Sequence, residues 1–499
     1  MTRSLRRSVQ GFGPRRYAVT WALAAACLAG VAAAFLLPGV SEAIAVFAVL
    51  SLLVVVVAIA PQLPVGLILV GLLFARVLTD NSSEGSRQSS AFNPSVGIAI
   101  ALLVLATGLA LAPGMRTEWM VLPALMIAGW TGLSIVNFGA SPVVWREGVR
   151  ELSILAVAVL GAAVVQRWRR PWFISHAILA ITIVPALLAI YQFFTRSGMI
   201  VAGDIRAFGT FSHPNAAAPV FGLSIVLCLA ILDARGGLRY AILGGVFGLA
   251  LVSTGSLTGF VATIVMIVAY AMLRPGSTGR KAGLVLFALI IVAAFLLSPL
   301  GQERLAEQAN FSIEAYGNKD ASDTSLAWRL YNWSTLLSEL GRSPILGFGL
   351  GTTTTGSTAT GTIPHNEYVR YLYETGIIGF AFLLLGIAVL LRCLMRAHRR
   401  TGLPVSEALA AVAVIVGLLV HALSANTVLS TVLMYLVAFL VGGSLNTPSP
   451  KELRGTEDDN SADRPAKAGT RRGRHLHTRP GALLPPKHPA ANSGRRRSW

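Results

Sequence analysis

The amino-acid sequence predicts an all-α polytopic membrane protein with about 14 transmembrane helices, in a range of about 12–14. Two features of the composition support this fold class. Hydrophobic residues make up 54% of the 499 residues and charged residues only 13%, whereas a soluble globular domain carries roughly 25% charged residues. The mean hydropathy is +0.66, and the apolar residues gather into runs close to the roughly 20 residues that cross a bilayer.

The apolar runs are separated by breaks that contain charged, Pro, Gly or Ser residues. The first run is longer than the apolar core of a signal peptide, which has about 7–15 residues, so we expect a retained first helix. A single re-entrant element over 240–273 is the alternative to two helices there. The predicted spans are 18–37, 43–60, 62–78, 96–112, 119–137, 151–166, 172–195, 215–232, 240–254, 256–273, 282–299, 371–391, 404–422 and 426–444.

The positive charge indicates how the helices are oriented. The formal net charge is +19, but the basic residues stand between apolar runs and in the tail, so we expect no nucleic-acid partner. With the N-terminus inside, the links with clustered basic residues fall on the cytoplasmic side, which is the positive-inside pattern. Both termini are therefore predicted to be cytoplasmic. The basic residues of the predicted cytoplasmic links are Arg167, Arg169, Arg170, Arg235, Arg239, Arg274, Arg280, Lys281, Arg392, Arg396, Arg399 and Arg400.

We expect two parts of the chain to differ in order. Residues 1–444 form a membrane-embedded domain with one large external loop at about 300–370. Residues 445–499 are rich in Pro, Gly, Ser and Arg and cannot bury an apolar core, so they are predicted to form a disordered, basic cytoplasmic tail. Cysteine spacing and the scattered acidic residues suggest neither a metal site nor a cofactor.

The external stretch "GDIRAFGTFSHPNAAAPVF" (203–221) contains a first candidate site residue, Arg206. The positive-inside bias does not explain an external arginine, and arginine is costly near hydrocarbon unless it meets an anion. His213 precedes Pro214, which suits the first position of a helix. We therefore interpret His213 first as a capping or interfacial residue.

The external loop contains "SDTSLAWRLYNWSTLLSELG" (322–341), whose apolar residues recur at helical spacing. This pattern predicts an amphipathic helix on the outer membrane surface. Arg329 lies off the apolar stripe, where it would contact either lipid phosphates or a substrate. The stripe consists of Leu326, Leu330, Trp333, Leu337 and Leu340.

The densest polar cluster is "PHNEYVRYLYETGIIGF" (364–380), at the start of an apolar run. Glu367 and Glu374 flank Arg370 at i−3 and i+4, so these three residues are predicted to form salt bridges with one another. His365 has no such partner in the sequence. A neutral histidine is the usual general base near pH 7, and His365 is therefore the candidate catalytic base.

Three stretches together resemble the O-antigen ligase and Wzy-type polymerase superfamily of bacterial surface-glycan assembly. They are the Arg206–Asn215 stretch, with its "GTFSHPN", then "WRLYNW" followed by "PILGFGLG" (328–351), and "HNEYVRYLYETGIIG" (365–379). The last is similar to the family signature H-N-x-x-L-x-x-x-x-E-x-G-x-x-G. One departure is "TGSLTGF" (254–260), where Leu257 stands at a position that is often basic in the family.

The resemblance implies a GT-C-like, metal-independent glycosyltransferase of the bacterial plasma (inner) membrane, with its active site on the external face. It implies an undecaprenyl-diphosphate-linked glycan donor and a glycan or other cell-envelope acceptor. His365 would act on the acceptor hydroxyl, while Arg206 and Arg329 would stabilise the leaving diphosphate. The predicted substrate-binding residues are Arg206, Arg329, Asn366, Glu367, His213 and Tyr368.

The sequence leaves other functions open. Polymerase and ligase share these motifs. A transporter or lipid-linked glycan flippase would place ionisable residues near the bilayer midplane, where the main candidates are Arg76, His176 and His421. A structural scaffold would leave the external arginines and histidine unexplained.

Overall fold

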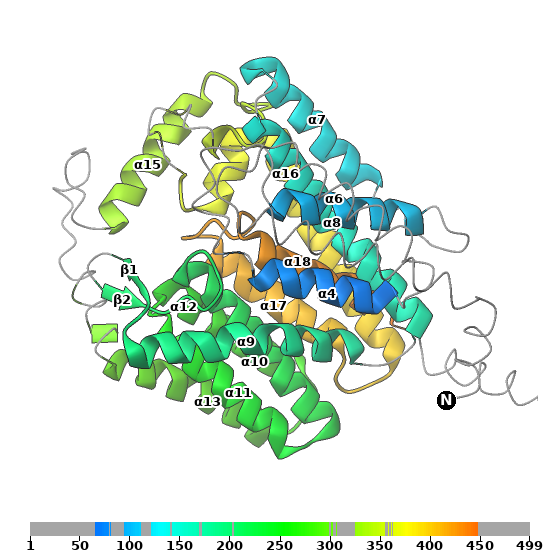
Figure 1. Ribbon diagram of the computed structural model, residues 1–499, viewed down its shortest axis with the longest axis vertical. Helices are drawn as coiled ribbons and strands as arrows, with labels where there is room; N and C mark the ends of the chain where they lie inside the picture. Colours follow the sequence, from blue (N-terminus) through cyan, green and yellow to red (C-terminus); the bar gives the residue numbers. More distant parts are fainter. Residues whose placement is uncertain are drawn as a thin grey trace, which may run out of the picture. The chain divides into compact units, whose positions relative to one another are not determined.

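Each predicted apolar run that falls within the described residues forms a helix in the computed structural model (Figure 1). The runs at 18–37 and 43–60, and the tail beyond residue 447, lie outside the described residues. The structure describes residues 65–78, 80, 94–110, 121–139, 142–168, 172–201, 204–298, 301–302, 306, 325–354, 358, 361 and 363–447. The helices are α4 (Val65–Leu78), α6 (Pro94–Ala110), α7 (Val121–Phe138), α8 (Pro142–Trp168), α9 (Phe173–Thr195), α10 (Pro214–Arg235), α11 (Leu238–Ser253), α12 (Leu257–Leu273), α13 (Thr278–Leu297), α15 (Ser325–Leu340), α16 (Glu367–Thr401), α17 (Glu407–His421) and α18 (Thr431–Leu445).

Two local features bear on the expectations. Residues 240–273 form two helices, α11 and α12, with a turn between them; whether each crosses the bilayer or the pair is re-entrant stays a prediction. An antiparallel hairpin of β1 (Met199–Val201) and β2 (Asp204–Arg206) follows α9 and was not predicted. Its strands have three residues each, too few for an alternating pattern to stand out.

The helices are apolar enough for a membrane protein. Among the described residues, four helices are long and apolar enough to cross a bilayer: Val144–Gln166, Phe173–Thr195, Pro214–Arg235 and Glu367–Thr401. Shorter apolar helices such as α12, α17 and α18 accompany them. The chain is thus an all-α membrane protein, while the number of about 14 spans and the GT-C-like arrangement stay predictions.

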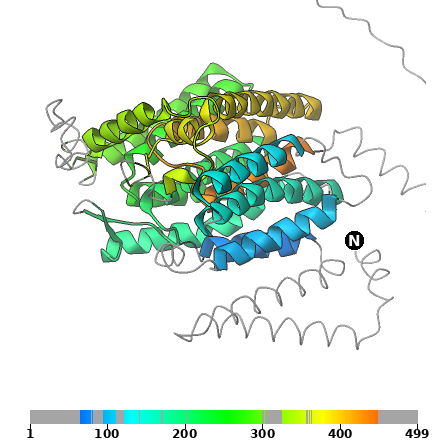
Figure 2. The ribbon, with the colours of Figure 1, turned by 90° about the horizontal axis from the view of Figure 1, so that it is seen from above.

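The core of the bundle depends on close contacts between helices. α18 packs along α8, and α12 packs along α17; seen from above, the helices still lie side by side (Figure 2). A Cβ on Gly442 would collide with the backbone of Ala158, so the small residue permits the close approach of α18 to α8. Fully buried aromatic side chains fill the interior, among them Phe211, Phe221, Phe247, Phe260 and Phe439.

Hydrogen bonds gather the loops that carry the candidate residues at one end of the bundle, which we call the site end. There Arg206 donates to the carbonyl oxygen of Thr254 in the α11–α12 turn. The Glu367 N–H at the start of α16 donates to the Ala422 carbonyl oxygen after α17. β1, β2 and α15 lie at this end, on the left of Figure 1.

Helix α16 is broken at Gly376, whose φ of 64° and ψ of −171° are not helical. The N–H groups of Ile377 and Ile378, beyond the break, donate to the carbonyl oxygens of Pro344 and Ile345 at 2.9 and 3.2 Å. In the other direction, the N–H groups of residues 348 and 349 donate to the carbonyl oxygens of residues 373 and 374, at 3.1 and 2.8 Å. The segment 344–349, which we call the inserted segment, therefore supplies the hydrogen bonds that the break removes.

Candidate functional site

Arg206 is held where two helices begin. Its side chain is only 4% exposed. The Nε atom donates to the Thr254 carbonyl oxygen at 2.8 Å, and Nη2 donates to Asn215 Oδ1 at 2.9 Å. Asn215 Oδ1 also accepts from Ser256 Oγ at 2.8 Å. Asn215 belongs to the first turn of α10 and Ser256 caps α12, so the guanidinium is fixed beside both helix starts.

His213 caps α10. Its Nδ1 atom accepts a hydrogen bond from the backbone N–H of Asn215 at 3.1 Å, and Pro214 takes the first helical position. The capping interpretation of His213 is therefore confirmed. A substrate contact from the same side chain stays a prediction.

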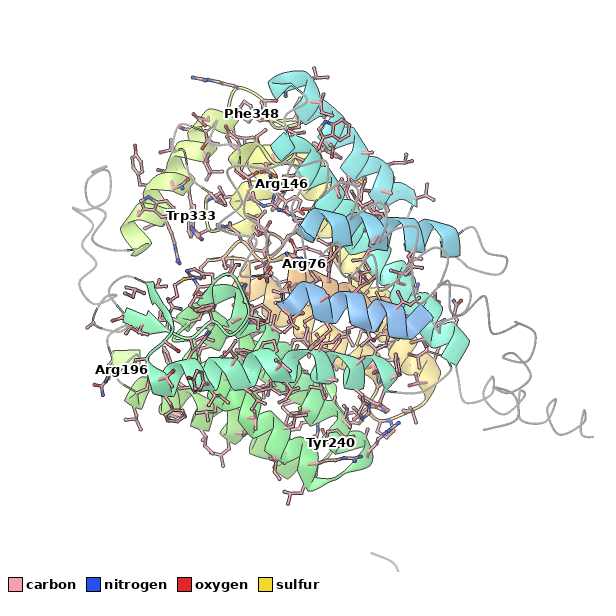
Figure 3. The ribbon with its side chains drawn as sticks, in the orientation of Figure 1. Arg76, Arg146, Arg196, Tyr240, Trp333 and Phe348 are labelled. Carbon is pink, nitrogen blue, oxygen red and sulfur yellow. The ribbon has the colours of Figure 1, made fainter. Side chains whose placement is uncertain are left out.

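The other candidate arginine and the histidine meet where α15 crosses the start of α16. Trp333 Nε1 donates to the Pro364 carbonyl oxygen at 2.6 Å and thereby holds α15 against the residue before His365. Trp333 lies on α15 in Figure 3. The Trp328 ring meets the His365 ring edge-on, with 5.7 Å between their centroids. Arg329, next to Trp328, is close enough for its charge to act on His365.

The face of α15 that is buried against the protein is offset from the predicted lipid-facing stripe. Leu336 and Leu340 are buried, and so is the polar Asn332, whereas Leu337 is 44% exposed. The buried face follows residues 332, 336 and 340, which are one helical turn apart. The predicted stripe faces lipid rather than protein, so the exposure of Leu337 does not contradict it, and contact of the stripe with the membrane surface stays a prediction. α15 packs on α16, and the Tyr373 hydroxyl donates to Glu339 Oε2 at 3.0 Å between the two helices.

His365 is neutral at physiological pH. Partial exclusion of water by the surrounding chain, and in second place the positive charge of Arg329, lower its pKa from the ordinary 6.5 to about 4. Part of the residue still reaches the surface. Its backbone has a φ of 52°, a conformation that is uncommon for a residue with a Cβ. The ring is thus accessible and carries a lone pair, as a general base must.

The residues that follow His365 have mainly structural contacts. Asn366 caps α16, and its side chain accepts from the N–H groups of Tyr368 and Val369 at 3.0 and 3.1 Å. The Tyr368 hydroxyl donates to the Leu419 carbonyl oxygen at 2.7 Å. These bonds fix the start of α16 against α17. A substrate-binding role for Asn366, Glu367 and Tyr368 stays a prediction.

The predicted salt bridges of Arg370 are present and fully buried. Arg370 pairs with Glu367, and Nη1 donates to Glu374 Oε2 at 3.0 Å. Arg370 is 0% exposed. Three further members come from α8 and were not predicted, although Glu147 and Arg150 have the same spacing of three residues as Glu367 and Arg370. This buried charge cluster consists of Glu147, Arg150, Glu151, Glu367, Arg370 and Glu374.

The buried charge cluster connects α8 to α16 and to the residues that follow the inserted segment. Tyr371 donates its hydroxyl to Glu151 at 3.2 Å, and Thr353 donates both its N–H and its hydroxyl to Glu374 Oε1. Arg146, also on α8, lies in the same region (Figure 3). The cluster therefore positions the helix that follows His365 rather than facing an open surface.

Polar contacts connect the two arginine regions through the turn between α17 and α18. Thr258, in the first turn of α12, and Ser424 have their hydroxyl oxygens 3.1 Å apart. Two residues further along, Asn426 Nδ2 lies 3.4 Å from His365 Nδ1. The structure thus connects the Arg206 region to the His365 region by way of Asn215, Ser256 and this turn.

Among the described helices, α10, α12, α16 and α18 have their first turns at the site end. Each helix start has a partial positive charge equivalent to roughly half a unit. Together with the fixed guanidinium of Arg206, these helix starts favour a negatively charged ligand. Among the described residues, no group of three or more His, Cys, Asp or Glu side chains is arranged to hold a metal ion.

The comparison with protein families agrees with this site. Residues 240–384 match the family model described as O-antigen ligase. The match includes Arg329, the inserted segment, His365 and the start of α16, whereas Arg206 and Asn426 lie outside it. No curated protein matches the chain. The match covers two of the three stretches that carry the resemblance, 328–351 and 365–379, and it confirms that this part of the chain is similar to the O-antigen ligase family.

Proposed function

We propose that the protein transfers a glycan from an undecaprenyl-diphosphate-linked donor to an acceptor hydroxyl in bacterial surface-glycan assembly. The site faces the exterior of the inner membrane, and both termini are cytoplasmic. The observation that carries this proposal is the placement of the buried, doubly anchored Arg206 at the same end of the bundle as Arg329 and the neutral His365.

Arg206 and Arg329 bind the diphosphate and stabilise the charge that develops on it. The donor sugar is already activated, because its anomeric carbon is bonded to a good leaving group. As that C–O bond breaks, the bonding electrons move onto the diphosphate. Guanidinium groups suit phosphate oxygens, and donors fixed in advance are often the largest contribution to catalysis. The starts of α10 and α12 add to the positive potential beside Arg206.

His365 removes the proton from the acceptor hydroxyl. The oxygen then forms the new bond to the anomeric carbon, the bond to the diphosphate breaks, and the proton stays on the imidazole ring. A pKa of about 4 in the free protein makes His365 a weak base. The negative charge of a bound diphosphate offsets the charge of Arg329 and raises this pKa, so the ring becomes a stronger base once the donor is bound.

A transporter or flippase is the second candidate, and the positions of its three candidate residues argue against it. Arg76 is in the last turn of α4 and pairs with Asp80. His176 is in the first turn of α9 and contacts Tyr240 at 2.8 Å. His421 ends α17. All three lie at helix ends rather than at the middle of a span, where a transporter binds its substrate.

The test uses purified protein and an undecaprenyl-diphosphate-linked repeat unit with no other acceptor. A ladder of products on a sizing gel identifies a polymerase, which we favour over a ligase. We expect Arg206→Ala, Arg329→Ala and His365→Ala to abolish the ladder while the proteins insert and purify normally. Loss of the base alone should slow transfer about 10²–10⁴-fold.

The matched control is Arg196→Ala, which removes an exposed arginine just after α9 (Figure 3) and should retain the ladder. Full activity of His365→Ala would eliminate the base assignment. If wild-type protein gives no ladder but transfers the glycan when a candidate envelope acceptor is added, the protein is a ligase. Movement of the lipid across vesicles without any transfer would instead support the flippase.

A further inference from the structure

Asn426 is a polar residue at the site that the sequence motifs did not indicate. It lies in the turn between α17 and α18, and its Nδ2 atom is 3.4 Å from His365 Nδ1. Its Oδ1 atom is buried and has no hydrogen-bond partner among the described residues. An unpaired buried oxygen costs about 1–3 kcal/mol, so this side chain is held beside the histidine at an energetic cost.

The turn that carries Asn426 is fixed on both sides of that residue. The Glu367 N–H donates to the Ala422 carbonyl oxygen at 2.9 Å, and the Val428 N–H donates to Glu367 Oε2 at 3.2 Å. Ser424 contacts Thr258 of α12. Because Glu367 is itself paired with Arg370, the buried charge cluster determines where Asn426 meets the His365 ring.

The groups that contact or act on the His365 ring come from α15 and from the turn between α17 and α18. Arg329 of α15 is the charged group that acts on it, and Trp328 of the same helix lies at its edge. From the turn between α17 and α18, the neutral amide of Asn426 meets the ring. The Glu367 carboxylate is two residues after His365 in the chain, but it pairs with Arg370 and accepts a hydrogen bond from the Val428 N–H. An uncharged amide is thus the polar side chain that contacts Nδ1.

We propose that Asn426 is a positioning residue that determines which ring nitrogen of His365 carries the proton. This inference rests on the proposed function of His365 as the base. A half-turn of the amide about its last side-chain bond places Oδ1 against Nδ1. In that arrangement the Nδ1–H donates to Oδ1, and the lone pair is on Nε2.

The choice of tautomer has a direct chemical consequence. With the NH₂ group toward Nδ1, that nitrogen accepts a hydrogen bond, Nε2 carries the proton, and Nε2 cannot take another from an acceptor hydroxyl. With Oδ1 toward Nδ1, Nε2 accepts the hydroxyl proton and the resulting imidazolium keeps its Nδ1–H bonded to Asn426. The amide oxygen therefore supports the base in both protonation states.

The experiment measures the protonation of the two His365 ring nitrogens directly and does not depend on transfer activity. Protein labelled with ¹⁵N-histidine is purified in detergent, and the ring nitrogen shifts are recorded by NMR from pH 3.5 to 8. The His365→Ala variant identifies the His365 signals among those of the eight histidines. In wild type we expect the tautomer protonated at Nδ1. We expect Asn426→Ala to give a mixture of both tautomers.

Two further variants make the result decisive. Asn426→Asp places a carboxylate at Nδ1 and should raise the pKa of His365 by one unit or more. Leu423→Ala removes an exposed side chain from the same turn and should change neither the tautomer nor the pKa. An unchanged tautomer ratio in Asn426→Ala, with a folded protein, would overturn the positioning role.

Activity assays separate this inference from the proposed function. If Asn426→Ala lowers kcat about tenfold or more with little change in KM, and Asn426→Asp restores part of it, the positioning role is supported. If His365→Ala is fully active, the base assignment fails even where the NMR result holds. If His365→Ala is inactive and Asn426→Ala is fully active, the base stands and the positioning role fails.

Discussion

Gly349 donates its backbone N–H to the carbonyl oxygen of Glu374 over 2.8 Å. Through this bond and its neighbours, the break in α16 is closed by a segment that precedes it in the chain. The segment leads from α15, which carries Arg329, whereas the broken helix follows directly on His365. The backbone around Gly376 therefore sets how the candidate arginine approaches the candidate base.

Replacing Gly376 with alanine should disrupt this arrangement. A Cβ at Gly376 would collide with the Ile345 carbonyl group, and its φ of 64° disfavours any residue with a side chain. We expect Gly376→Ala to lower the free energy of unfolding by about 1–3 kcal/mol and to reduce transfer activity. Gly386→Ala is the control on the same helix, since nothing lies within 4 Å of its added Cβ. If Gly376→Ala and Gly386→Ala unfold at the same temperature, the break at Gly376 does not stabilise the protein as proposed.

Arg370 should be essential for stability rather than for chemistry. Its side chain is 0% exposed and lies between Glu367 and Glu374. Arg370→Leu leaves these carboxylates without their partner, and breaking a buried pair costs about 3–5 kcal/mol. Thermal unfolding in detergent measures the loss. The exposed Arg392 of the same helix provides the comparison: a loss of similar size in Arg392→Leu would mean that charge alone, and not buried pairing, matters.

The titration of His365 should depend on Arg329. The pKa of about 4 lies below the ordinary 6.5, so the neutral ring is favoured in the folded protein and the base is lost as the pH falls through about 4. Arg329→Gln removes the repelling charge but leaves the partial burial. We therefore expect the pKa of His365 to rise but to stay below 6.5. NMR titration of the ring in ligand-free protein gives the value, and an unchanged pKa would place Arg329 too far away to act.

Arg206 should not be replaceable by lysine. Its guanidinium reaches the Thr254 carbonyl oxygen with one nitrogen and Asn215 with another. A lysine ammonium is a single point charge and cannot reproduce this fork. We expect Arg206→Lys to lose most of the transfer activity and about 1–3 kcal/mol of stability. Arg196→Lys, at an exposed position, should match wild type in both, and a fully active Arg206→Lys would show that charge suffices.

The sequence predicted the features that depend on neighbours along the chain. Apolar length located the helices, and the spacing of three and four residues predicted the pairs of Arg370. The contributions of Glu147 and Glu151 were missed because they come from another helix, and Asn426 was missed because it meets His365 across 61 residues. The break at Gly376 was missed because a glycine in an apolar run is common in membrane helices. Contacts of this kind depend on tertiary packing, which periodicity does not encode.

The break at Gly376 also bears on how far the long helix α16 reaches. As one piece, its 35 residues would extend about 52 Å at 1.5 Å per residue, well beyond the roughly 30 Å of hydrocarbon. Residues 377–401 alone extend about 37 Å, which is enough for one crossing. The short portion before the break is therefore not needed to cross the hydrocarbon. That portion is fixed instead by the buried ion pairs of Arg370 with Glu367 and Glu374, so it can hold the start of α16 at the site end while the residues beyond the break make the crossing.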